Sequence, residues 1–222
     1  EWLLQLERRL QPDVIHLNGY AHGALPFRAP TLVIGHSCVL SWWLAVRHEE
    51  APPAWETYRR RVASGLRAAD FVAAPTHAML DALLEHYGPL PRTGVIYNGR
   101  AADLFPPAEK RPLIFSAGRL WDEAKNIRAL EAAATRVSWP VHVAGEAAHR
   151  SETGGGKRNC VRCLGHLTAP EIAQCMGEAA IYAMPAKYEP FGLSILEAAL
   201  AQCALVVGDI PSLREVWGDA AM

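Results

Sequence analysis

Short apolar runs of strand length alternate along the chain with segments whose apolar residues recur at helical spacing. The strand-like runs lie at residues 13–19, 31–37, 71–74, 94–97, 113–117, 141–144, up to 165, 180–184 and 204–207. The helical segments lie at residues 1–10, 55–69, 77–87, 127–134, after Pro170 and after Gly192. This alternation predicts an α/β protein with a parallel sheet in each half of the chain.

A cluster of prolines interrupts the alternation near the middle of the chain. Pro106, Pro107 and Pro112 mark a linker, because proline ends regular elements and favours extended segments. We therefore expect one domain over residues 1–106 and a second over residues 107–222.

The stretch from Lys187 to Glu197 changes from a strand pattern to a helix pattern across a Pro/Gly loop. The new helix should begin within residues 191–194. The first turn of a helix presents unpaired N–H groups and the positive end of the macrodipole, both of which suit a phosphate. Gly192 lets the backbone approach such a ligand closely, since it carries no Cβ.

Glu189 and Glu197 bracket this loop with seven residues between them. Eight helical steps of ~1.5 Å would separate them by ~12 Å, whereas paired carboxylates of glycosidases lie roughly 5 to 9.5 Å apart. The two glutamates are therefore better suited to gripping the ends of one long ligand. The alternative is an ordinary strand–helix turn with a surface glutamate at each end.

Two cations follow another predicted strand. Arg119 comes directly after Gly118, and Lys125 lies six residues further along the chain. At the carboxyl end of a strand they could neutralise a pyrophosphate as it leaves. The alternative is a pair of solvated surface cations.

These motifs together resemble a known enzyme family. Glu-Pro-Phe-Gly-Leu-x-x-x-Glu is similar to the E-x7-E motif of retaining glycosyltransferases of family 4, and Gly-Arg-Leu…Lys-Asn at residues 118–126 is similar to their diphosphate-binding segment. The resemblance implies a GT-B fold, in which two Rossmann-like domains face a cleft. It also implies transfer of a sugar from a nucleotide-diphosphate-sugar co-substrate with retention, without a metal or a resident cofactor.

The resemblance further implies roles for individual residues. Glu189 would face the donor sugar, Glu197 would accept hydrogen bonds from the ribose, and Arg119 and Lys125 would grip the diphosphate. His36 would lie across the cleft from the sugar. The remaining contacts to the nucleotide and its phosphates would come from Phe191, Gly192, Leu193, Gly118, Gly165 and His166.

Some of these residues have other interpretations. A lone histidine such as His36 is often a hydrogen-bonded core residue. Trp42 and Trp43 could stack on an acceptor sugar or simply pack. Cys160, Cys163 and His166 have a zinc-like spacing, but structural zinc needs four ligands, so we favour the end of a strand beside the nucleotide base.

The composition of the chain limits the classes of partner that we expect it to bind. Lys plus Arg number 22 against 23 for Asp plus Glu, so no overall field favours nucleic acid. Five scattered cysteines suggest a reducing compartment, and the uncharged run at residues 29–46 is broken by Pro30 and Gly35. We expect a cytoplasmic protein with a glycan or lipid-linked acceptor. Arg59, Arg60 and Arg67 form either a solvated face or a peripheral contact with the inner face of a membrane.

The chain begins at Glu1 and lacks the leading strand and glycine-rich loop of the family. We therefore expect a fragment whose first domain is truncated and whose activity is uncertain. A nucleotide-sugar epimerase and a non-catalytic nucleotide-binding remnant are the alternative functions.

Overall fold

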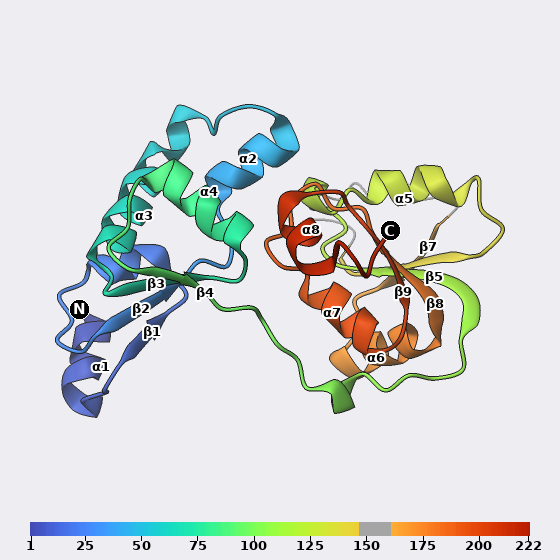
Figure 1. The fold of residues 1–222 in the computed structure, drawn as a ribbon, viewed down its shortest axis with the longest axis horizontal. Helices are drawn as coiled ribbons and strands as arrows, with labels where there is room; N and C mark the ends of the chain where they lie inside the picture. The colour runs from blue at the N-terminus through green and yellow to red at the C-terminus, as the bar shows by residue number, and fades with distance from the viewer. Residues whose placement is uncertain (147–160) are drawn as a thin grey trace. The chain divides into compact units, whose positions relative to one another are not determined.

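The computed structural model describes residues 1–146 and 161–222, and it divides into two units, Glu1–Tyr97 and Asn98–Met222. Each unit is a parallel sheet with helices packed on it (Figure 1). The alternation of the sequence therefore gives the α/β architecture that it predicts.

The first unit has a four-stranded sheet with the order β1-β2-β3-β4. Its strands are β1 Ile15–Leu17, β2 Thr31–Ile34, β3 Phe71–Ala74 and β4 Thr93–Val95. Its helices are α1 Trp2–Leu10, η1 Tyr20–Ala24, α2 Val39–Arg47, η2 Pro53–Trp55, α3 Glu56–Ala68 and α4 His77–Tyr87. Val33 and Val72, which pair across β2 and β3, are fully buried in its core.

Helix α2 is absent from the sequence prediction. Its sequence, VLSWWLAVR, is apolar almost all round, so it shows no clear amphipathic period. Leu40, Ser41 and Val46 are its buried residues. Helix α4, in contrast, begins as predicted, with the Thr76 hydroxyl accepting a hydrogen bond from the Met79 amide.

The second unit has a five-stranded sheet with the order β7-β6-β5-β8-β9. Its strands are β5 Arg111–Ala117, β6 Val141–Ala144, β7 Val161–Gly165, β8 Ala179–Met184 and β9 Ala204–Val207. Its helices are η3 Ala102–Leu104, η4 Glu123–Lys125, α5 Ile127–Ala134, α6 Ala169–Glu178, α7 Leu193–Leu200 and α8 Pro211–Trp217.

Two cores hold this second sheet. Phe115 and Tyr182, neighbours on β5 and β8, belong to a core that includes residues of α6, α7 and α8. Val143 and Ala183 belong to a second core, formed with residues of α5. The alternation of Tyr182 and Ala183 between the two cores is the period-two pattern of a strand covered on both faces.

The second unit begins at Asn98, whereas the predicted boundary follows residue 106. The connecting segment packs on the second unit, because Phe105 is buried in its core and the Ala108 amide donates to the Gly177 carbonyl oxygen at 3.3 Å. The predicted glycine-rich tip at residues 154–156 lies outside the described residues. No helix in the described ranges is long and apolar enough to cross a membrane.

Candidate active site

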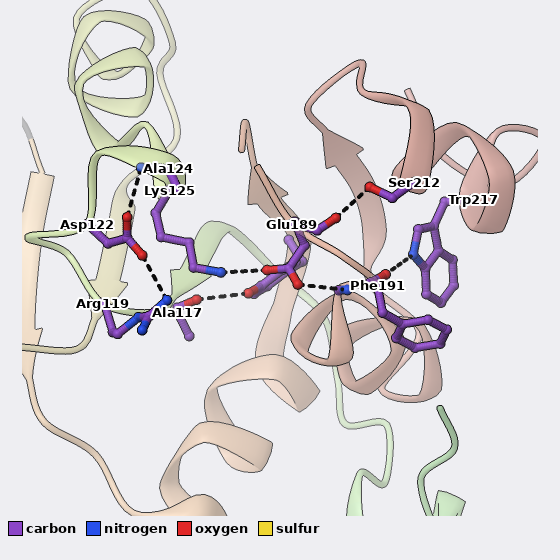
Figure 2. Close-up of polar contacts among 11 residues, drawn as sticks. Ala117, Arg119, Asp122, Ala124, Lys125, Glu189, Phe191, Ser212 and Trp217 are labelled. Atoms are coloured by element: carbon purple, nitrogen blue, oxygen red, sulfur yellow. Dashed lines mark hydrogen bonds and ion pairs between the residues drawn. The ribbon is translucent and has the colours of Figure 1, made fainter. Parts of the chain in front are cut away.

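The second sheet reverses its strand order at β5 and β8. From β5 the chain builds outward through β6 and β7, and it then returns to place β8 and β9 on the other side of β5. In open parallel sheets ligands bind outside the carboxyl ends of the strands at such a switch point. The loops that follow β5 and β8 carry the two predicted motifs (Figure 2).

Backbone and side-chain hydrogen bonds join these two loops. The Lys187 amide donates to the Ala124 carbonyl oxygen at 2.8 Å, and the Asn126 side-chain amide donates to the Pro185 carbonyl oxygen at 3.0 Å. Asn126 has a left-handed backbone (φ 52°), a conformation that asparagine tolerates. The two loops therefore form one preorganised frame.

Glu189 is the centre of this frame. One of its carboxylate oxygens accepts a hydrogen bond from the Lys125 ammonium at 2.5 Å, and the other accepts from the Gly192 amide at 3.1 Å. The side chains of Lys125 and Glu189 are 16% and 15% exposed, so the pair is largely removed from solvent. Figure 2 shows the ammonium of Lys125 directed at Glu189. Lys125 therefore contacts the motif turn through Glu189.

Gly192 precedes α7 with a left-handed backbone (φ 88°), and a Cβ added there would lie 2.6 Å from Cδ1 of Ile195. Phe191 is buried, and its carbonyl oxygen accepts a hydrogen bond from Nε1 of Trp217 at 3.3 Å. Leu193 is partly exposed. The structure thus supplies the turn predicted for a phosphate, with the start of a helix behind it.

Arg119 takes a different partner from Lys125. Its guanidinium donates to the buried Asp122 carboxylate at 2.8 Å and lies 5.4 Å from the ring centroid of Trp121. Asp122 also accepts a hydrogen bond from the Ala124 amide, so it holds η4 and Arg119 together. Arg119 is directed within its own loop, with a side chain 63% exposed.

Glu197 lies further along α7. Its carboxylate accepts a hydrogen bond from Nε of Arg100 at 2.7 Å, and its side chain is 12% exposed. Arg100 belongs to the connecting segment ahead of β5, and no pattern in the sequence points to this contact.

The predicted glycines lie at the carboxyl ends of neighbouring strands. The Gly118 amide donates to the Ala144 carbonyl oxygen at 3.0 Å, and the Gly145 amide donates to the Gly165 carbonyl oxygen at 2.7 Å. His166 follows as an exposed residue. Among the residues that the structure describes, no group of three His, Cys, Asp or Glu side chains could hold a metal ion, while Cys160 lies outside them.

Tyr182 is a site-supporting residue that the sequence analysis misses. It is fully buried on β8, and its hydroxyl donates to the Ala117 carbonyl oxygen at 3.2 Å, at the end of β5. Burial raises the pKa of Tyr182, so its hydroxyl stays protonated and can keep this bond. Strand alternation places this tyrosine inward, but only the neighbouring strand supplies its partner.

His36 belongs to the first unit, after β2. Its Nε2 lies 2.9 Å from Oδ1 of Asn18, which follows β1, so the structure joins two polar residues from neighbouring strand ends. Trp42 and Trp43 lie edge to face, with ring centroids 5.8 Å apart. His36 and Glu189 belong to different units, and the predicted role of His36 stays a prediction.

We expect His36 to titrate below its ordinary value. Burial lowers the pKa of His36 and the nearby His16 lowers it further, so the neutral ring is favoured in the folded chain. As pH falls through 6.5, the unfolded chain takes up this proton first, and the free energy of unfolding of the first unit should decrease. NMR titration of the imidazole, assigned with His36→Gln, checks this; a midpoint at or above 6.5 would contradict it.

The two parallel sheets and the frame at the switch point define an α/β protein of the ligand-binding, Rossmann-like type, and comparisons with known proteins give its family. Residues 111–221 match the family model for glycosyl transferases group 1, and residues 1–104 match that for glycosyltransferase family 4. The chain belongs to the group 1 glycosyl transferases, of the family 4 type.

Curated relatives agree with this family. A glycogen synthase of Mycobacterium tuberculosis is 28% identical over 237 residues, covering 96% of this chain and 56% of the relative. An O-antigen chain mannosyltransferase B of Escherichia coli is 28% identical over 137 residues, covering 54% and 36%. The chain thus spans little more than half the length of the longer match.

Solved structures show the same fold. A sucrose-phosphate synthase from Thermosynechococcus elongatus has a TM-score of 0.77 at 21% identity, covering 95% of this chain and 59% of its own. Anabaena HepE in complex with UDP-glucose has a TM-score of 0.74 at 22% identity, covering 96% and 64%. The GT-B fold that the sequence predicts is confirmed.

Proposed function

We propose that this glycosyltransferase moves a sugar from a nucleotide-diphosphate-sugar to an acceptor hydroxyl with retention at the anomeric carbon. The observation that carries the proposal is the Lys125–Glu189 pair, held at the start of α7 and at the switch point of the sheet. Neighbours solved with UDP and with UDP-glucose support a donor of this class.

In this proposal the chain stabilises the departing diphosphate. Lys125, Arg119 and the amides of the first turn of α7 supply positive charge where negative charge develops. The turn and the Lys125 side chain are fixed before the reaction by the hydrogen bonds between the loops and by the contact with Glu189, whereas Arg119 is held at Asp122. Cationic side chains, in place of a metal ion, carry the charge stabilisation.

Retention is carried over from the family resemblance, and we propose that it occurs without a covalent intermediate on Glu189. Both of its carboxylate oxygens already accept hydrogen bonds, from Lys125 and from the Gly192 amide, which makes it a poor covalent nucleophile. We therefore propose that the acceptor hydroxyl attacks on the face from which the diphosphate leaves, and that a phosphate oxygen takes its proton. Glu189 then orients Lys125 and faces the sugar.

Glu197 is assigned to the ribose, and Gly165 and His166 are assigned to the nucleotide base. The role of His36 toward the sugar is carried over from the family resemblance alone. The acceptor is proposed to be a growing glycan or a lipid-linked glycan, reached in the cytoplasm. Three exposed arginines lie on α3, namely Arg59, Arg60 and Arg67. A peripheral contact of these arginines with a membrane is therefore also part of the proposal. Chromatography of products formed from donor alone separates transfer from epimerisation.

Replacing Glu197 by alanine should abolish the thermal response to the nucleotide. A thermal-shift screen of UDP, GDP, ADP and their sugars identifies the ligand; at 100 times its Kd, stabilisation of ~2.7 kcal/mol should raise Tm by about 5 to 10 °C. Glu178→Ala is the matched control, because Glu178 pairs with Arg111 away from the switch point. A full response from Glu197→Ala would overturn the ribose assignment.

A further inference from the structure

Each glutamate of the motif forms an ion pair with a cationic side chain from a separate part of the chain. Glu189 pairs with Lys125 of η4, and Glu197 pairs with Arg100 of the connecting segment, 97 residues earlier in the sequence. The two glutamate side chains are 15% and 12% exposed. The frame therefore contains two ion pairs. The sequence motifs indicate the cation of only one of them, Lys125.

The two cations reduce the repulsion that the glutamates would exert on an anionic ligand. A diphosphate brought near α7 would be repelled by any uncompensated carboxylate, and charges that are largely removed from solvent are screened little by salt. Lys125 offsets the charge of Glu189 at 2.5 Å, and Arg100 offsets that of Glu197 at 2.7 Å. Without Arg100, the same helix that attracts the phosphates would present an unbalanced negative charge.

The contact also leaves Glu197 able to bind a ligand. Nε of Arg100 donates to Oε1, whereas a carboxylate offers about four acceptor sites over its two oxygens. One charge-assisted hydrogen bond fixes the rotamer of Glu197 and leaves acceptor capacity for ribose hydroxyls. The Arg100 side chain is 42% exposed, whereas that of Glu197 is 12% exposed.

We propose that Arg100 is a positioning residue of the donor site, which holds the Glu197 carboxylate in place for the ribose hydroxyls and compensates its charge. The inference rests on the proposed function, because it assumes that Glu197 binds the ribose. It adds a residue that lies outside both recognised motifs and close to the start of the second unit.

Isothermal titration calorimetry with a ribonucleotide and its 2′-deoxy counterpart tests this role. UDP and dUDP are the probes, replaced by the GDP or ADP pairs if the thermal screen selects another base. In the full chain, Arg100→Ala should raise Kd for UDP about tenfold, as expected for losing a hydrogen bond to a charged group. The preference for UDP over dUDP should shrink, and Arg100→Lys should restore part of it.

Arg111→Ala is the matched control, since it breaks an arginine–glutamate pair of the same unit and should leave both Kd values unchanged. Tm of Arg100→Ala should stay near that of the unmodified chain, because the arginine is half exposed. A purely structural role would lower Tm and weaken UDP and dUDP equally.

If Glu197→Ala has lost UDP binding, three results would overturn the role of Arg100 while leaving the ribose assignment of Glu197 intact. Arg100→Ala could bind UDP as before; it could bind UDP more tightly, which would show that the guanidinium competes with the ribose; or it could weaken both nucleotides in the same ratio. If Glu197→Ala binds UDP like the unmodified chain, the ribose assignment and this inference fall together.

Discussion

Replacing Lys125 by alanine is expected to lower kcat/KM for the donor at least about 100-fold. The variant loses a cation placed against the developing charge of the leaving diphosphate, an effect of about 3 kcal/mol or more in a preorganised site. It also leaves Glu189, which is 15% exposed, without its positive partner. Release of the nucleoside diphosphate from the sugar donor, with and without glycan acceptors, measures the loss.

The matched control for this experiment is Arg128→Ala, which removes an exposed cation at the second residue of α5. It should keep the rate of the unmodified chain. The double variant Lys125→Met/Glu189→Gln removes both charges, so it should fold without an unpaired carboxylate and still be inactive. A Lys125→Ala enzyme that keeps more than half of its rate would exclude the proposed role of this lysine.

Replacing Gly192 by alanine should destabilise the second unit by about 2 to 5 kcal/mol and remove nucleotide binding. Roughly 1 to 2 kcal/mol comes from the left-handed backbone at φ 88°. The remainder, about 1 to 3 kcal/mol, comes from overpacking, because the new Cβ would lie 2.6 Å from Cδ1 of the fully buried Ile195. A shifted turn would also move the amides of α7 away from the phosphate position.

Urea unfolding followed by circular dichroism measures the loss of stability, and the thermal-shift screen measures the loss of binding. Gly99→Ala is the control, because a Cβ at that position has nothing within 4 Å, and its effect should stay within about 0.5 kcal/mol. A Gly192→Ala chain as stable as Gly99→Ala would show that the turn has another conformation in solution.

Local patterns in the sequence determined much of the fold and the positions of the two motifs. The strand and helix periods predicted both sheets, and the change of period at Gly192 placed the start of α7. Lys125 and Glu189 were each predicted to be site residues, from their local motifs and from the family resemblance of those motifs. Helix α2 was missed, because an all-apolar helix has no period to detect.

Only the tertiary structure decided which of these residues meet. The strand order β7-β6-β5-β8-β9 brings Lys125 to Glu189 and Tyr182 to Ala117, and the path of the connecting segment brings Arg100 to Glu197. The physical reason is that hydrophobic periodicity reports burial within one element at a time. Contacts between distant elements depend on how the sheet is assembled, which no single stretch of sequence records.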